Sequence, residues 1–300
     1  MRRTRAHAAG RRRGLRNYRT LEPYVYALPA LIFAVMFTYY PFLRTFYNSL
    51  FVVNIYGQAT RFLGLANYRG VLANKNFLEA LVNSLKYTAM GVPSSLLISL
   101  FLALMAERER SCSRVSEMLF SLPMAVSMST TCMIFKLLLN PTVGYLNYAL
   151  GIKVNWLHDV KTALPALVAT SVWTNIGYQF IFLMAALRGI PTDLQEAASI
   201  EGAGWLARTR RITLPLITPT IFYLMCTDIV MNMMMAGPTM VLTRGNPRRS
   251  TVTLIYHMYD RSIYNQFWGY GYAMSVLIFL IIFGMILLAF RMERRGVHYA

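Results

Sequence analysis

Long apolar runs separated by short polar segments dominate the hydrophobic pattern of this chain. A helix that crosses the hydrocarbon core of a bilayer needs about 20 consecutive, predominantly apolar residues. Six stretches meet that length, and we expect each to form a membrane-spanning helix: Val25–Leu43, Leu85–Ala106, Met118–Leu139, Ala163–Leu187, Leu214–Ala236 and Tyr270–Phe290. The pattern therefore predicts an all-α, polytopic protein of the cell membrane, with a six-helix transmembrane domain over residues 25–290.

Composition supports this prediction. Of the 300 residues, 56% are hydrophobic and only 14% are charged, whereas soluble domains carry about 25% charged residues. The basic start of the chain is followed by a full-length span rather than by a short apolar region with a cleavage site, so we expect no cleavable signal peptide.

The distribution of basic residues predicts the orientation of the spans. The formal net charge is +18, from 30 Lys and Arg against 12 Asp and Glu. If the N-terminus is cytoplasmic, 18 of the 30 basic residues lie on the cytoplasmic side and 12 on the other. The positive-inside rule therefore places both termini in the cytoplasm. Residues 1–24 and 291–300 would be cytoplasmic tails. The first of them would contact anionic lipid rather than nucleic acid, because nothing resembles a folded nucleic-acid module.

The chain offers few motifs for a disulfide framework, a metal site or nucleotide binding. The three cysteines are scattered and the four histidines form no H-E-x-x-H motif, so neither a disulfide framework nor a zinc site is expected. No Gly-Lys dipeptide occurs, which excludes a P-loop for ATP phosphates. We expect this chain to bind no metal or cofactor and to catalyse no reaction itself.

One polar segment between the fourth and fifth predicted spans differs from the other connections. Thr192 followed by Gln195 matches a capping box, so we expect Thr192 to cap a short helix. Gly202 should end or bend that helix, because glycine is common at helix C-termini. A second amphipathic stretch over residues 205–213 then runs into the next span. The segment 191–213 is therefore expected to form two short helices at the cytoplasmic face.

This segment resembles the "EAA" loop that couples the permeases of ATP-binding-cassette importers to their ATPases. The family pattern is E-A-A, two residues, D-G-A and then I-x-L-P. The matching residues are Glu196, Ala197, Ala198, Glu201, Gly202, Ala203, Leu214 and Pro215. Two positions depart from the pattern, because Glu201 replaces the usual Asp and Thr209 replaces the usual Phe.

Weaker matches follow the family order along nearly the whole chain, over residues 62–68, 139–147, 171–173, 185–191 and 253–256. They resemble the carbohydrate-importer branch, whose members import oligosaccharides, monosaccharides or glycerol-3-phosphate. The resemblance implies a permease subunit that moves a sugar or related polyol into the cell. Its implied partners are a second homologous permease, two cytoplasmic ATPase subunits that bind ATP and Mg, and an extracytoplasmic solute-binding protein.

Two alternatives remain open. A permease for sn-glycerol-3-phosphate is favoured by the resemblance of residues 253–256 and opposed by charge, since a mid-membrane carboxylate would repel phosphate. A secondary transporter would need no ATPase and would be expected to show internally repeated broken helices.

Asp228 lies near the middle of the fifth predicted span, where a carboxylate is costly and is a functional candidate by default. It would either contact the substrate along the pathway or accept hydrogen bonds between helices. Aromatic faces can pack on sugar C–H groups and amides can bond hydroxyls. The further pathway candidates, which could equally be packing residues, are Trp173, Asn175, Tyr178, Gln179, Tyr223 and Asn232.

Overall fold

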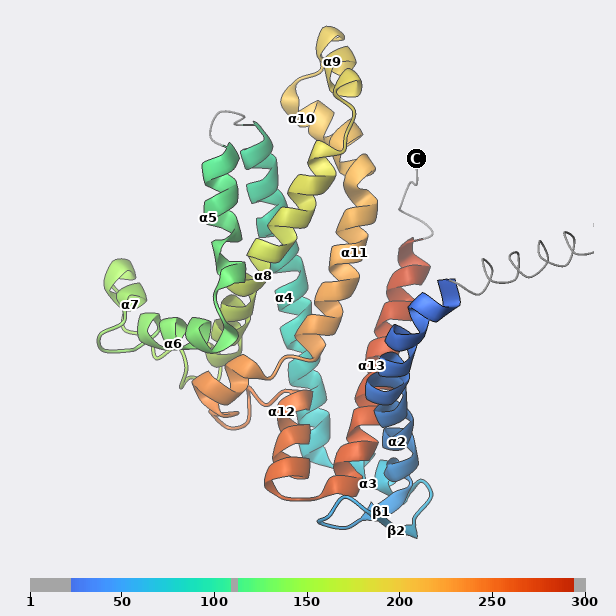
Figure 1. Cartoon of the computed structure of the whole chain (residues 1–300). Helices are drawn as coiled ribbons and strands as arrows, with labels where there is room; N and C mark the ends of the chain where they lie inside the picture. Colours follow the sequence, from blue (N-terminus) through green and yellow to red (C-terminus); the bar gives the residue numbers. More distant parts are fainter. Residues whose placement is uncertain (1–22, 109–112, 294–300) are drawn as a thin grey trace, which may run out of the picture.

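The computed structural model describes residues 23–108 and 113–293. Most of the predicted N-terminal tail (1–24) and residues 294–300 of the C-terminal tail lie outside these ranges. The protein is mainly helical, and its long helices run roughly alongside one another (Figure 1). The sidedness of the termini relative to a membrane stays a prediction.

Five continuous helices are long and apolar enough to cross a membrane: Pro23–Ser49, Lys75–Glu107, Ala163–Arg188, Trp205–Met233 and Trp268–Arg291. The first contains a π-helical turn, η1 (Val35–Tyr39), followed by α2 (Tyr40–Ser49). The next two are α4 (Lys75–Arg108) and α8 (Ala163–Arg188). The fourth joins α10 (Trp205–Arg208), the π-helical turn η2 (Thr209–Thr213) and α11 (Leu214–Met233), and the fifth is α13 (Trp268–Glu293). Five of the six predicted spans are thereby confirmed as helices.

The third predicted span, Met118–Leu139, is not one straight helix. It divides into α5 (Ser113–Ala125) and α6 (Met128–Leu138), which are bent by 99° relative to each other. Pro123 lies in the last turn of α5, and Ser127 has extended backbone and accepts a hydrogen bond from the Thr130 amide. A proline removes a backbone donor and Ser127 caps a new helix, so the chain turns here. The described residues therefore hold five spans, or six if the bent pair crosses once.

Helices α4, α8 and α11 pack against one another at the centre, α5 lies beside α8, and α2 lies beside α13 (Figure 1). Ala103, Phe180, Leu183 and Leu224 are fully buried where the three central helices meet. None of the most apolar window of Pro23–Ser49 is buried. The first span therefore leaves a wide apolar surface to lipid or to another protein.

Short elements occupy the two ends of the bundle. The loop helix α9 (Thr192–Ile200) projects at one end with α10 (Figure 1). The opposite end carries the helices α3 (Ala66–Leu72) and α12 (Leu254–Tyr259) and an antiparallel pair of strands. The remaining short elements are α7 (Tyr145–Leu150) and the π-helical turns η3 (Thr239–Thr243) and η4 (Asp260–Tyr264).

The strand pair is an addition to the predicted all-α architecture. Strand β1 (Phe51–Val53) pairs with β2 (Ala59–Phe62), with Phe51 opposite Phe62. The Asn67 side chain donates hydrogen bonds to the carbonyl oxygens of Ser49 and Phe51, at 2.9 and 3.0 Å. These bonds tie the start of α3 to the junction between α2 and β1.

Candidate functional site

The loop between α8 and α11 forms the two short helices that the sequence predicts. Helix α9 ends in a Schellman motif, in which the Ala203 amide donates to Ala198 O at 2.9 Å and the Gly202 amide to Ser199 O at 3.1 Å. Gly202 has φ +79°, a conformation that glycine adopts without steric cost. A Cβ there would meet no atom within 4 Å. The glycine is required by backbone conformation and not by crowding within this chain.

The start of α9 differs from the expected capping box. Pro191, with φ −57° and ψ 130°, is the residue that precedes the helix, and no side chain caps it. Thr192 is already helical and therefore cannot act as the cap. Asp193 lies in the first turn, where a negative charge is favoured by the helix dipole.

Half of the residues of the predicted coupling motif are exposed, and the others are half-buried. Glu196, Ala197, Glu201 and Gly202 are exposed, whereas Ala198, Ala203, Leu214 and Pro215 are half-buried. Two large apolar side chains in or beside the motif are also exposed, Ile200 at 88% and Leu206 at 72%. An apolar surface flanked by acidic residues at the end of a projecting loop is typical of a protein contact site.

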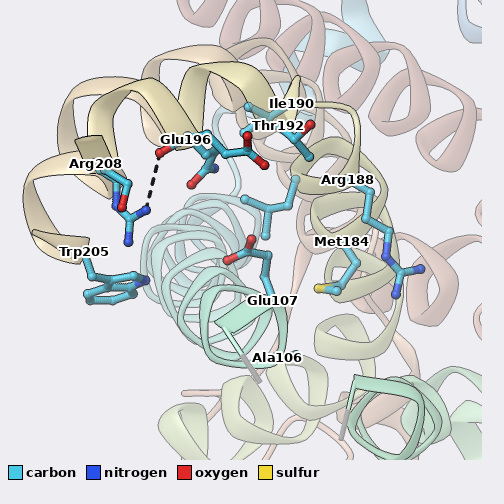
Figure 2. Close-up of a pocket in the computed structure, with 12 residues that line it drawn as sticks. Ala106, Glu107, Met184, Arg188, Ile190, Thr192, Glu196, Trp205 and Arg208 are labelled. Atoms are coloured by element: carbon cyan, nitrogen blue, oxygen red, sulfur yellow. Dashed lines mark hydrogen bonds between the residues drawn. The ribbon is translucent and has the colours of Figure 1, made fainter. Parts of the chain in front are cut away.

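Beneath α9 the loop encloses a pocket of about 550 Å³, shown in Figure 2. Two acidic side chains, Glu107 and Glu196, and two basic ones, Arg188 and Arg208, contribute to its lining. Arg208 donates to the backbone oxygen of Gln195 at 3.5 Å and so links α10 to α9. Arg188 forms an ion pair with Glu117 on α5. The first contact lies within the loop, and the second joins α5 to the end of α8, where the loop begins.

Asp228 lies in α11 and is only 4% exposed. Its carboxylate accepts a hydrogen bond from each of the central helices: from Ser95 of α4 at 2.6 Å, from Asn175 of α8 at 2.8 Å and from Asn232 of α11 itself at 2.9 Å. These bonds satisfy a buried carboxylate and join α4, α8 and α11 in one cluster. The geometry gives Asp228 a role in helix packing, and its contact with substrate stays a prediction.

The cluster extends into α8 through the predicted candidate Gln179, and into α4 through Ser95 and Ser99, which the sequence analysis did not select. Gln179 donates to Ser95 Oγ at 3.2 Å and accepts from Ser99 at 3.0 Å. Gly91 allows α4 to approach α11 closely, because a Cβ there would lie 2.6 Å from Asn232 Oδ1. Ser95 and Ser99, four residues apart in an apolar span, were the signal for a polar helix interface.

The aromatic candidates lie in two other groups. Tyr178 packs on Phe182, with ring centroids 4.7 Å apart, and Phe182 packs on Tyr223 at 5.8 Å. Trp173 instead contacts Phe135, with centroids 6.1 Å apart. Tyr223 is 48% exposed, so of these rings it is the most accessible to a ligand. The structure therefore brings Asp228, Asn175 and Asn232 together in one hydrogen-bonded cluster, while the aromatic candidates make ring contacts with Phe182 or Phe135.

Comparison with known proteins identifies a family and relatives. Residues 62–296 match the family model described as "Binding-protein-dependent transport system inner membrane component". The sn-glycerol-3-phosphate transport system permease protein UgpA of Pectobacterium atrosepticum is 32% identical over 281 residues, which cover 92% of this chain and 95% of that protein. The protein of the same name in Agrobacterium fabrum is 31% identical, with 92% and 96% covered.

Solved structures show the same fold. A chain of a bacterial transporter involved in the import of the acidic polysaccharide alginate superposes with a TM-score of 0.80 at 20% identity, covering 94% of this chain and 99% of that one. A second structure of an alginate transporter, in complex with a periplasmic protein carrying an alginate pentasaccharide, gives a TM-score of 0.81 at 20% identity, with 93% and 97% covered.

Proposed function

Because the chain belongs to the binding-protein-dependent transport system inner membrane components, we propose that it is a permease subunit of an ATP-binding-cassette importer for a sugar or related polyol. Separate ATPase subunits drive the transport. ATP and Mg bind to those subunits, and this chain binds neither. Family membership and the resemblance of residues 62–296 to a transport component support a role in transport rather than in catalysis.

The observation that carries the proposal is the connection between the exposed loop and α11. Glu196, Glu201 and the apolar Ile200 and Leu206 form the surface that would contact an ATPase subunit. From Trp205 to Met233 the backbone is helical without a break. Nucleotide-driven closure of the ATPase pair would push on the loop and therefore move α11. This movement would switch the substrate pathway between inward- and outward-facing states.

The proposed partners are a second homologous permease, two cytoplasmic ATPase subunits and an extracytoplasmic solute-binding protein. A periplasmic protein is part of one structurally similar alginate transporter. The unburied apolar surface of Pro23–Ser49 offers area for the second permease and for lipid.

The second candidate is an importer of sn-glycerol-3-phosphate. It is favoured by relatives of that name at 31–32% identity over 92% of the chain. The two candidates differ in one property of the solute, which is the charge of the phosphate group. Asp228 does not decide between them, because hydrogen-bond donors from three helices already satisfy its carboxylate.

Reconstitution tests the proposal. The complex of this chain with its partner permease, ATPases and binding protein would be placed in proteoliposomes, and uptake of labelled sn-glycerol-3-phosphate would be compared with that of a sugar panel. We expect ATP-dependent uptake of one solute class, its loss in Glu196→Lys, and no ATP hydrolysis by this chain alone. Magnesium-dependent hydrolysis by the highly purified chain, or uptake that needs no ATPase, would overturn the proposal.

A further inference from the structure

A second pocket lies at the end of the molecule opposite α9, between the first turns of α4 and the loop that follows η3. Its volume is about 400 Å³. The lining residues are Leu78, Glu79, Val82, Asn83, Lys86, Arg248, Arg249 and Ser250. Three of them are basic and one is acidic, so the pocket carries a net positive charge.

The loop that supplies the two arginines is held on α4 by hydrogen bonds. The Asn83 side chain donates to the carbonyl oxygens of Arg249 and Val252, at 3.0 and 3.1 Å. The Leu254 amide donates to Ser84 Oγ at 2.8 Å. Two loop residues, Arg249 and Val252, and the first residue of α12, Leu254, are therefore bonded to two neighbouring residues of α4.

The backbone of this loop is strained where it presents the arginines. Arg248 has φ +47° and Arg249 has φ +62°, in a region that bulky side chains seldom adopt. A residue held in this region is strained, and such strain is concentrated at functional sites. The fold therefore holds two adjacent arginines over α4 despite an energetic cost.

Several hydrogen-bond donors in the pocket have no acceptor. Within the described part of the chain, Arg249 Nε, Arg249 Nη2 and Ser250 Oγ are buried atoms without a hydrogen-bond partner. Glu79 Oε2 lies 3.4 Å from Arg249 Nε and forms an ion pair with it, but the contact lacks hydrogen-bond geometry. Buried hydrogen-bond donors normally have an acceptor, and a buried donor without one indicates a position where an ion or water can bind.

We propose that this pocket binds an anionic phosphate or carboxylate group. The planar guanidinium of Arg249 can donate two parallel hydrogen bonds to such a group, and Lys86 and Arg248 add positive charge. The Ser250 hydroxyl supplies a further donor. Two sources carry this chemistry, namely an anionic solute on its way to the transporter and the headgroup of an anionic lipid.

Binding measurements on the assembled importer test the proposal without the transport cycle. The complex of permeases and ATPases, without ATP or binding protein, would be placed in nanodiscs of phosphatidylcholine. Broadening of the ³¹P resonance of inorganic phosphate reports binding of a soluble anion. In nanodiscs that also contain phosphatidylglycerol, native mass spectrometry reports retention of the anionic lipid.

The variants are Arg249→Gln and Lys86→Gln, with Arg69→Gln as the control. Lys86 and Arg69 are both exposed, and Arg69 lies on α3 at the same end of the molecule but outside the pocket. We expect each pocket variant to weaken binding of the probe about five- to tenfold, as for loss of one charge-assisted contact. The control should bind as the original complex does.

The two probes distinguish the sources. Phosphate binding that depends on Lys86 and Arg249 assigns the pocket to a soluble anion, and retention of phosphatidylglycerol alone with the same dependence assigns it to lipid. Absence of both signals, or equal signals in the pocket variants and in Arg69→Gln, would overturn the proposal. The binding assay contains no ATP, so it is independent of the uptake assay in proteoliposomes. A complex that binds neither probe but shows normal ATP-driven uptake would overturn the anion site and leave the proposed transport function standing.

Discussion

At the scale of single residues, Asp228 shows how a carboxylate can be kept inside a membrane bundle. Burial of a charge is costly unless hydrogen bonds compensate for the lost water. Here Oδ1 accepts from Asn175 and Asn232 while Oδ2 accepts from Ser95. The sequence pointed to Asp228, but only the structure identifies all its partners, because Ser95 and Asn175 come from helices that are distant along the chain.

We expect Asp228→Ala to lower the unfolding temperature of the assembled complex by several degrees. The substitution removes the carboxylate that accepts from Ser95, Asn175 and Asn232. Ser95 and Asn232 keep a backbone acceptor each, Val92 O and the carbonyl oxygen of residue 228, whereas Asn175 loses its partner, and a donor left without an acceptor costs about 1–3 kcal/mol. The unfolding temperature of Asp228→Asn should remain close to that of the original complex, because the amide oxygen can still accept from the two asparagines. Its amide can donate to Ser95 Oγ, whose hydroxyl can turn to Val92 O, 3.1 Å away.

Thermal unfolding in detergent and solute uptake would be measured on the same preparations of both variants. Equal unfolding temperatures for the alanine variant and the original would contradict the packing role. A loss of uptake in Asp228→Asn at unchanged stability would instead support a contact with substrate.

At the scale of elements, apolar length predicts where helices exist and does not predict where they bend. The five continuous spans follow from runs of apolar residues, and two of them stay helical through an interior proline, Pro93 in α4 and Pro219 in α11. The turn between α5 and α6 depends on Pro123 and on the cap at Ser127, which the apolar pattern over 118–139 conceals. The hairpin of β1 and β2 was not predicted either, because strands of three and four residues give too short a pattern to recognise.

The turn after α9 leads to a prediction with a matched control. Gly202 has φ +79° whereas Gly204 has φ −65°, and neither would place a Cβ within 4 Å of other atoms. Gly202→Ala should cost about 1 kcal/mol through backbone strain and loosen the Schellman turn. We expect it to reduce the stimulation of ATP hydrolysis by the loaded binding protein, while Gly204→Ala should preserve it. Equal stimulation in the two variants would show that the turn geometry does not matter for coupling.

The contact of α4 with α11 leads to another prediction. Because a Cβ at Gly91 would lie 2.6 Å from Asn232 Oδ1, Gly91→Ala should push the two helices apart or displace the Asn232 amide. Overpacking of this kind typically costs about 1–3 kcal/mol. We expect a lower unfolding temperature for the complex than with Gly284→Ala. The control lies in α13, where a Cβ would meet nothing within 4 Å. An unfolding temperature no lower than that of the control would contradict the close approach.

At the scale of the whole molecule, two features combine into a path from the loop to the centre of the bundle. The loop continues into α11 over the unbroken helix Trp205–Met233. About midway along the bundle, the Asp228 cluster joins α11 to α4 and α8. A displacement of the loop by the ATPases would therefore move three central helices together, provided that the connection at η2 is stiff.

The stiffness of that connection can be tested at Arg210 and Arg211, which are both exposed in η2. Replacing both by glycine and, in a matched variant, both by alanine removes the same two charges. The pair of glycines costs about 1 kcal/mol per residue in helix propensity relative to alanine, so only the glycine variant weakens the helix. We expect it to transport less solute per ATP hydrolysed in proteoliposomes, while the alanine variant keeps the original ratio. A flexible joint at η2 could not transmit a push along α11. An equal amount of solute transported per ATP in the two variants would therefore show that the ATPase movement reaches the substrate pathway by another route.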